Sequence, residues 1–468
     1  MNISKPSAKM LILAGIVTVA IALRLYHLTA NPLWIDEGWT LYVSTHGWME
    51  IPFLDVHPPV HYWLIKIVTS VIGTGEAAIR ATSVAFGVAA VVMAYLFGRE
   101  FTGHDWPGLV AAGIMAVTPD QIFHSQDARS YTIWVTVWMV FMIFYLRSMD
   151  HPDSKRGWVI TGALAGALMW IHYWSIFPLA FLGMYALWRN KRALVAPVYG
   201  VAVFTGIFIP LIPIFLRGIS IKSVEGWTIF HPWNVILQNT WMAFSGGNTV
   251  LAILFLVFTC IGLFLLLENR KYSMRFEIAM ILFASTVIVF LASSPWFMVI
   301  PKYAMYLAPI VYSLVGAGVC AITVPFVMHN KKLGAIVIAL VMICSAVPLT
   351  SYYAETNRGG WYDHNKELTA ITNGGPVAIL ANPGLFTQWV YYYSGETVLF
   401  YNMEHLEWYA HRSNHVRGFA NNCDVQYFFV PTGDLPDDVP EAKRIYDYLQ
   451  ENGEYITTYR GFEGWRVG

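Results

Sequence analysis

The chain has 468 residues, of which 56% are hydrophobic and 12% are charged, whereas soluble domains carry about 25% charged residues. Its 29 basic and 29 acidic residues leave no net charge at pH 7. This composition excludes an ordinary soluble globular protein. The lack of a basic excess also argues against a nucleic-acid partner, which would be attracted through its phosphates.

Long apolar stretches account for most of the chain. A run of about 17 to 25 apolar residues is long enough to cross a bilayer. We identify about eleven such runs, at residues 9–28, 81–98, 107–123, 131–147, 157–173, 174–188, 193–216, 249–267, 278–300, 303–328 and 333–353. The sequence therefore predicts an α-helical polytopic membrane protein of the cell membrane.

A further apolar run at residues 58–73 begins with two prolines and contains Lys66. Basic residues are enriched in cytoplasmic loops. All basic clusters fall on one side of the membrane only if this run does not cross. The clusters are Lys5/Lys9, Arg147/Lys155/Arg156, Arg189/Lys191/Arg192, Arg270/Lys271/Arg275 and Lys331/Lys332. We therefore predict a surface or re-entrant segment, a cytoplasmic N-terminus and a first external loop over residues 29–80.

The composition changes near residue 354. The remaining stretch has the Gly, Pro and Asn turn signals of a soluble domain. Short apolar strands at 376–381 and 425–430 and a charged helical stretch at 439–452 predict a small α/β fold. We predict a transmembrane domain over residues 1–353 and a soluble extracytoplasmic α/β domain over residues 354–468.

Carboxylates and histidines gather in the predicted first external loop. Trp34-Ile35-Asp36-Glu37-Gly38-Trp39 follows the first span, and alone it is equally typical of a wetted loop or a helix N-cap. The second cluster is Asp55-Val56-His57-Pro58-Pro59-Val60-His61-Tyr62. A single histidine there is more typical of an interfacial ring than of a ligand. The two clusters together favour a functional site.

Two further polar segments lie between predicted spans. Gln126, Asp127, Arg129 and Tyr131 stand in the first, and ionisable residues at membrane depth are expensive and indicate function. The alternative for Arg129 is an ion pair with a neighbouring aspartate that satisfies a helix junction. The second segment is Pro301-Lys302-Tyr303, where the alternative for the lysine is interfacial snorkelling.

The order of these motifs resembles the protein O-mannosyltransferase-like glycosyltransferases, which include the aminoarabinose transferases of lipid A. The motifs are Arg24-Leu25-Tyr26-His27-Leu28, Leu33-Trp34-Ile35-Asp36-Glu37, His57-Pro58-Pro59, Glu76 to Arg80 and Ser125 to Tyr131. The resemblance is densest over residues 20–150 and resumes at Pro301-Lys302-Tyr303. It implies the GT-C architecture and a polyprenyl-phosphate sugar donor.

The resemblance also implies residue roles. Asp36 corresponds to the general base of the first external loop, and Arg129 to the basic residue for the donor phosphate. Asp127 stands where the family often has Glu, and His57 stands where the aminoarabinose branch has Lys. These departures leave the donor sugar open.

The chemistry of the residues agrees with this assignment. A carboxylate must take the proton from an acceptor hydroxyl in the transition state, and a planar guanidinium can pair with the leaving phosphate. Direct displacement with one base predicts inversion at the anomeric carbon. We predict Asp36 as the catalytic residue and a wider set as substrate-binding: Glu37, Asp55, His57, His61, Arg80, Gln126, Arg129, Tyr131, Lys302 and Tyr303.

Alternatives stay open at this point. Asp36, Glu37, Asp55 and His57 offer oxygen and imidazole ligands to a divalent metal ion, yet no recognised ligand spacing requires one, and no other cofactor is indicated. The acceptor is a protein, a lipid or a glycan. The second hypothesis is a transporter or flippase for a lipid-linked sugar. Such a protein should have polar groups near the membrane midplane and a repeat in its two halves, whereas this chain concentrates its polar residues on one face and shows no evident repeat. A structural anchor for the C-terminal domain would not explain so many spans.

Overall fold

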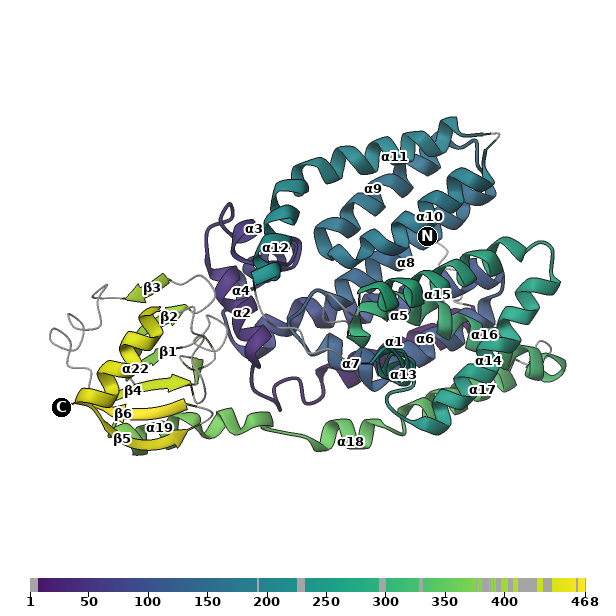
Figure 1. Cartoon of the computed structure of the whole chain (residues 1–468). Helices are drawn as coiled ribbons and strands as arrows, with labels where there is room; N and C mark the ends of the chain where they lie inside the picture. The colour runs from purple at the N-terminus through teal and green to yellow at the C-terminus, as the bar shows by residue number, and fades with distance from the viewer. Residues whose placement is uncertain are drawn as a thin grey trace. The chain divides into compact units, whose positions relative to one another are not determined.

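The chain folds into two compact units (Figure 1). The computed structural model describes residues 7–191, 193–224, 232–293, 300–327, 331–375, 377–380, 387, 389, 391–392, 397–402, 407–410, 427–431, 440–459 and 462–467. We call Met1–Leu28 together with Gly47–Ala354 the membrane unit, and Thr29–His46 together with Glu355–Gly468 the sheet unit. Residues 29–46, which the sequence assigns to the transmembrane domain, thus fold with the C-terminal residues.

Apolar helices build the membrane unit and confirm an α-helical polytopic membrane protein. Among the described residues, seven stretches are long and apolar enough to cross a membrane. They are Ala8–Leu25 (α1), Glu76–Thr102 (α5), Tyr131–Asp150 (α8), Val195–Ile219 (α11 to α12), Thr249–Glu268 (α14), Ser273–Ser293 (α15) and Pro301–Thr323 (η3 and α16). The count of about eleven crossings stays a prediction.

The other described helical elements of this unit include the separate parts of the stretches Val195–Ile219 and Pro301–Thr323. They are α3 (Ile51–Leu54), α4 (Val60–Ile72), α6 (Asp105–Val117), α7 (Pro119–Ser125), α9 (Lys155–Ile171), η1 (Tyr173–Ser175), α10 (Ile176–Arg189), α11 (Val195–Phe208), η2 (Ile209–Leu211), α12 (Ile212–Val224), α13 (Trp233–Phe244), η3 (Pro301–Leu307), α16 (Ala308–Val327), α17 (Lys331–Ala346) and α18 (Leu349–Ala354). The 13 residues of α4 rise about 20 Å, less than the roughly 30 Å hydrocarbon core. Helix α4 is therefore too short to cross the membrane alone. This length is consistent with the predicted surface or re-entrant segment.

A break divides the apolar stretch predicted over residues 107–123. Helix α6 ends before Thr118, and Pro119 opens α7, because proline fits the first turn of a helix but not its interior. The buried guanidinium of Arg24 donates to the carbonyls of Met115 and Ala116, each at 3.0 Å. These carbonyls lie at the end of α6, where intrahelical partners are missing. The side chain of Arg24, in α1, therefore stabilises the break between α6 and α7.

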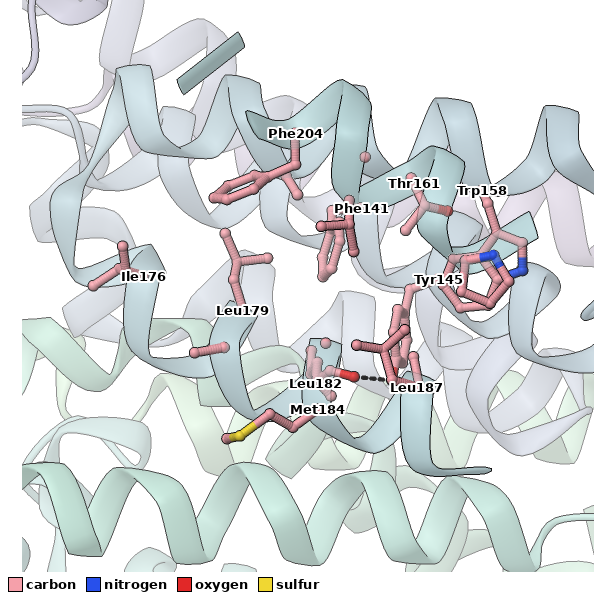
Figure 2. A pocket seen from close by; sticks show the side chains of 18 residues that line it. Phe141, Tyr145, Trp158, Thr161, Ile176, Leu179, Leu182, Met184, Leu187 and Phe204 are labelled. Carbon is pink, nitrogen blue, oxygen red and sulfur yellow. Dashed lines mark hydrogen bonds between the residues drawn. The ribbon is translucent and has the colours of Figure 1, made fainter. Parts of the chain in front are cut away.

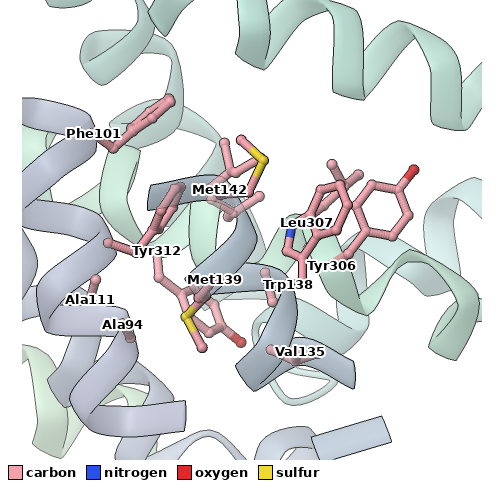
Figure 3. Packing of buried hydrophobic residues seen from close by; sticks show 14 of the residues in the cluster. Ala94, Phe101, Ala111, Val135, Trp138, Met139, Met142, Tyr306, Leu307 and Tyr312 are labelled. Carbon is pink, nitrogen blue, oxygen red and sulfur yellow. The ribbon is translucent and has the colours of Figure 1, made fainter. Parts of the chain in front are cut away.

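Small residues allow the central helices to pack closely. A side chain at Gly98 of α5 would lie 2.8 Å from the Cα of Gly108 in α6, so only glycine permits this approach. Figure 3 shows the neighbouring core, in which Trp138 and Met139 of α8 pack among side chains of α5, α6, η3 and α16. Arg80, Gln126, Arg129, Tyr131 and Lys302 lie in or beside the first or last turns of helices of this bundle, whereas Asp55, His57 and His61 lie in α4 or just before it.

The sheet unit contains a six-stranded mixed sheet, which confirms the predicted small C-terminal sheet. Its order is β3-β2-β1-β4-β6-β5, in which β1 pairs in parallel with β2 and β4 and the other pairs are antiparallel. The strands are β1 (Val377–Leu380), β2 (Thr397–Asn402), β3 (Glu407–Ala410), β4 (Tyr427–Pro431), β5 (Glu454–Tyr459) and β6 (Phe462–Arg466). Its helical elements with described bounds are α2 (Ile35–Thr45), η4 (Arg358–Asp363), α19 (His364–Thr372) and α22 (Pro440–Asn452).

Residues 29–46 are bound to this sheet unit by specific contacts. The amide of Asn31 donates to the carbonyl of Glu355 at 3.0 Å, and the backbone N–H of Leu33 donates to the hydroxyl of Tyr392 at 2.7 Å. The ring of Tyr42 in α2 packs against the core around Trp389. The first predicted carboxylate motif is therefore carried by the sheet unit.

Candidate active site

A buried carboxylate anchors the polar cluster of the membrane unit. Asp55 lies between α3 and α4 and is 9% exposed. Its Oδ1 accepts from the backbone N–H of Val56 at 2.6 Å, and its Oδ2 accepts from His57 Nδ1 at 3.0 Å and from the Tyr62 hydroxyl. Burial alone would raise the pKa of this carboxyl, but the charge and hydrogen bond of His57 and then the charge of Arg129 lower it below its usual range. Asp55 is therefore an anion at neutral pH.

Arg129 joins this cluster through His57. The Nη2 atom of Arg129 lies 3.4 Å from Nε2 of His57. The other ring nitrogen of His57, Nδ1, lies 3.0 Å from Oδ2 of Asp55, so the imidazole lies between the guanidinium and the carboxylate. The structure thus brings together three predicted site residues in the order carboxylate, imidazole, guanidinium.

His61 holds α4 against the turn that carries Arg129. Its Nε2 donates to the carbonyl of Ala128 at 2.8 Å, and the residue is 2% exposed. Burial, followed by the charge of Arg129, lowers the pKa of His61 to about 3. His61 is therefore neutral at physiological pH, and its contact positions the turn without adding charge.

A second cation lies against the same turn. The Nζ of Lys302, in η3, is 5.0 Å from the centre of the Tyr131 ring, a cation–π arrangement. Tyr131 begins α8 two residues after Arg129. Tyr303 is buried and stacks on Trp174 with ring centres 4.6 Å apart. Arg129 therefore lies in the segment that connects α7 to α8, and Lys302 contacts the first residue of α8.

Arg80 and Gln126 bind the C-terminal end of α1. Arg80 donates to the carbonyl of Leu28 at 2.7 Å. The amide nitrogen of Gln126 lies 3.0 Å from the carbonyl of Arg24 and 2.7 Å from that of Tyr26, where helical partners are missing. These contacts stabilise a helix junction, and a substrate-binding role for Arg80 and Gln126 stays a prediction.

The two adjacent carboxylates of the sheet unit differ in their contacts. Glu37 is 1% exposed, and its Oε2 accepts from the backbone N–H of Trp34 at 3.3 Å, which caps α2. Asp36 lies in the same helical turn and is half-buried. Successive residues on a helix point about 100° apart, so the cap uses one carboxylate and not the other. The role of Asp36 as a general base stays a prediction.

Two aromatic residues of this region were missed by sequence reasoning as site residues. Tyr62 bonds Asp55, and the ring of His172 stacks on Trp134 at 4.2 Å between centres. His172 also lies 5.6 Å from Tyr131 and 6.0 Å from Tyr303 between ring centres. A histidine at the end of an apolar run was the available signal for His172, whereas Tyr62 resembled any interfacial tyrosine.

The described residues contain no group of three or more His, Cys, Asp and Glu side chains placed to hold a metal ion.

A hollow of about 360 Å³ lies between α8, α9, α10 and α11 (Figure 2), where the Tyr145 hydroxyl donates to the carbonyl of Leu182 at 2.8 Å. Its lining residues include no Asp, Glu, Lys, Arg or His. This hollow therefore offers no carboxylate or imidazole base, in contrast to the cluster around Asp55.

Comparison with known sequences supports the motif order. Residues 56–216, less than half of the chain, match the family model described as dolichyl-phosphate-mannose-protein mannosyltransferase. This region contains His57, His61 and Arg129, while Asp36 and Lys302 lie outside it. No curated protein sequence matches the chain.

Solved structures share the fold over nearly the whole chain. ArnT from Cupriavidus metallidurans in the apo state has a TM-score of 0.66 and 13% identity, with 98% of each chain covered. A structure of the same ArnT bound to undecaprenyl phosphate has a TM-score of 0.64, 13% identity and 97% coverage of each chain. The oligosaccharyltransferase of Archaeoglobus fulgidus has a TM-score of 0.58 and 12% identity, covering 98% of this chain and 74% of that chain.

These similarities define the class of the molecule. At such low identities they show the fold, which is the GT-C fold of polytopic membrane proteins. Together with the family model, they confirm the resemblance to the GT-C glycosyltransferases that the motif order indicates.

Proposed function

We propose that the chain is an inverting glycosyltransferase that moves a sugar from a polyprenyl phosphate to an acceptor hydroxyl on the extracytoplasmic face. The observation that carries this proposal is the cluster of Arg129, His57 and Asp55 within the region matched to the mannosyltransferase family. It holds the buried guanidinium of Arg129 beside a half-buried imidazole, which is itself hydrogen-bonded to the buried carboxylate of Asp55. Such a preorganised cation suits a phosphate whose negative charge grows during reaction.

The reaction assigns Asp36 and Arg129 different tasks. The Asp36 carboxylate takes the proton of the acceptor hydroxyl while the acceptor oxygen forms a bond to the anomeric carbon. The bond from that carbon to the phosphate oxygen breaks, and its electron pair leaves with the polyprenyl phosphate. Arg129, with Lys302 as a second cation, stabilises this leaving phosphate.

The donor is proposed from chemistry and from likeness. A lipid phosphate places its charge near the membrane surface, and a structure of ArnT contains undecaprenyl phosphate. The sugar, with mannose as one option, the length of the polyprenol and the choice among protein, lipid and glycan acceptors depend on pocket shape. A cytoplasmic N-terminus and an extracytoplasmic sheet unit complete the proposed topology.

The test is transfer of radiolabelled sugar from a panel of polyprenyl-phosphate donors in membranes that contain equal amounts of each variant. Asp36→Asn removes the base but keeps the shape, so transfer should fall by about 10²- to 10⁴-fold. Asp447→Asn, on the exposed face of α22 in the same unit, is the matched control and should transfer normally. Transfer that is indifferent to Asp36 would overturn the mechanism. Movement of a lipid-linked sugar across the membrane without transfer would support a flippase instead.

A further inference from the structure

The charged hollow at the other end of α5 has no task in the proposed reaction. It has a volume of about 620 Å³ and is lined by the start of α1, the end of α5, the start of α6 and the residues from Lys271 to Arg275. Four of its lining side chains are cations: Lys9, Arg99, Lys271 and Arg275. This end of the membrane unit carries the basic clusters that are predicted to face the cytoplasm.

Two of these cations are neutralised by carboxylates. Lys9 Nζ lies 2.5 Å from Oδ2 of Asp105. Arg275 is buried and bonds Asp150 through both terminal nitrogens, with Nη1 2.8 Å from Oδ1. The carboxylate of Glu100, which also lines the hollow, pairs with Arg147 at 2.8 Å. Both acids that line the hollow, Glu100 and Asp105, therefore form ion pairs with cations other than Arg99 and Lys271.

The remaining two cations are held by aromatic faces. The guanidinium of Arg99 lies 5.9 Å from the centre of the Tyr95 ring, and Lys271 Nζ lies 5.4 Å from that of Tyr272. Cation–π contacts order a long side chain without cancelling its charge. The hollow therefore keeps an excess of two positive charges, and both side chains are exposed to an incoming anion.

An apolar groove continues from this charged hollow. The groove has a volume of about 610 Å³ and shares His104, Trp106 and Tyr272 with it. Beyond these residues it is lined by Glu268, Asn269 and Arg270 around the end of α14, and by apolar side chains of α14, α6 and α16 such as Leu266, Pro107 and Ala321. A polar compartment that opens into an apolar one matches a molecule with an anionic head and a hydrocarbon chain.

We propose that this end of the membrane unit binds one anionic phospholipid, with its phosphate between Arg99 and Lys271 and one acyl chain in the groove. Basic pockets between membrane helices on the cytoplasmic side suit anionic head groups. The groove favours a lipid over a soluble phosphate, because only a lipid gains by filling the apolar part. The site is independent of the glycosyltransferase proposal, since it contains none of the residues assigned to that reaction.

Native mass spectrometry of the delipidated full-length protein tests this site by titration with phosphatidylglycerol and, separately, phosphatidylcholine. We expect one saturable phosphatidylglycerol site and markedly weaker phosphatidylcholine binding. Arg99→Gln and Lys271→Gln should each weaken the site about fivefold, and the double variant about 25-fold, as expected for basic groups near lipid phosphate. Arg156→Gln removes an exposed cation outside the hollow and should change nothing.

The groove needs its own variant. Ala321→Phe fills the groove and should weaken phosphatidylglycerol binding, whereas Ile322→Phe, on the exposed side of the same helix, should not. Unchanged thermal midpoints would show that each variant folds. Equal binding by the Arg99/Lys271 double variant and Arg156→Gln would overturn the proposal. So would inorganic phosphate that binds through Arg99 and Lys271 while phosphatidylglycerol does not saturate, because the ligand would then be a soluble anion.

Discussion

The two ends of α5 carry charge in opposite ways. Near its N-terminal end, Ser83 reaches the backbone carbonyl of Arg129 at 3.3 Å, and the neighbouring Arg129 and Asp55 side chains are buried. At its C-terminal end, Arg99 and Lys271 are exposed beside a charged hollow. The charges at the N-terminal end are therefore shielded from water, whereas those at the C-terminal end are solvated.

This difference indicates what each end can do. A buried charge costs free energy unless neighbours pair with it, but it acts strongly on a reacting group because no water screens it. An exposed charge is inexpensive and weak, which suits reversible binding of a lipid head group. The comparison predicts large effects from substitutions near Asp55 and Arg129 and small ones near Glu100 and Arg147.

Among substitutions in the membrane unit, the largest effect is expected for Arg129→Ala. Loss of a preorganised donor to the leaving phosphate should reduce transfer by about 10²- to 10³-fold. Arg147→Ala removes an arginine at the other end of the membrane unit, where its partner is Glu100, and should leave transfer unchanged. Both are measured by initial rates of sugar transfer at equal abundance. Equal loss in the two variants would show that burial does not distinguish the ends.

Asp55→Asn should lower the free energy of unfolding by about 1–3 kcal/mol, because buried donors lose a charged acceptor. The donors are the backbone N–H of Val56, the ring of His57 and the hydroxyl of Tyr62. The same change at Asp105, whose side chain is 27% exposed, should cost less than about 1 kcal/mol. Denaturant unfolding of the purified protein in detergent measures both, and a larger cost at Asp105 would reverse the comparison.

Particular residues show how far the sequence could predict this cluster. His57 and Arg129 were assigned to one site because each stands in a polar break beside an apolar run, and the packing of those runs brings them to 3.4 Å. The contacts of Gln126 with the end of α1 depend on how two irregular helix ends meet, which no periodic pattern encodes. The placement of Asp36 with the sheet unit depends likewise on long-range contacts such as that of Leu33 with Tyr392.

The pH dependence of stability should reveal His61. Its pKa of about 3 in the folded protein lies below the ordinary 6.5, so the unfolded chain binds the proton more tightly. The stability that His61 contributes is therefore complete above pH 6.5 and is lost as the pH falls toward 3. At pH 5 the loss of stability is about 2 kcal/mol.

Thermal midpoints between pH 5 and 7.5 measure this effect. His61→Gln should flatten the dependence, while His151→Gln, an exposed histidine at the other end of the membrane unit, should retain it. If the two variants had the same pH slope as the unaltered protein, His61 would not be the neutral buried histidine that the structure shows.

The smallest effect is expected for the ion pair between Arg147 and Glu100. The Arg147 side chain is 50% exposed, so water screens its attraction to the carboxylate 2.8 Å away. A double-mutant cycle with Arg147→Ala and Glu100→Gln should give a coupling of about 0.2–1 kcal/mol, and added salt should reduce it. The pair of Arg275 and Asp150 is the matched case at the same end, because the Arg275 side chain is 8% exposed. Its coupling should be larger and less sensitive to salt, so burial, and not the end of the unit as such, sets the strength of a charge.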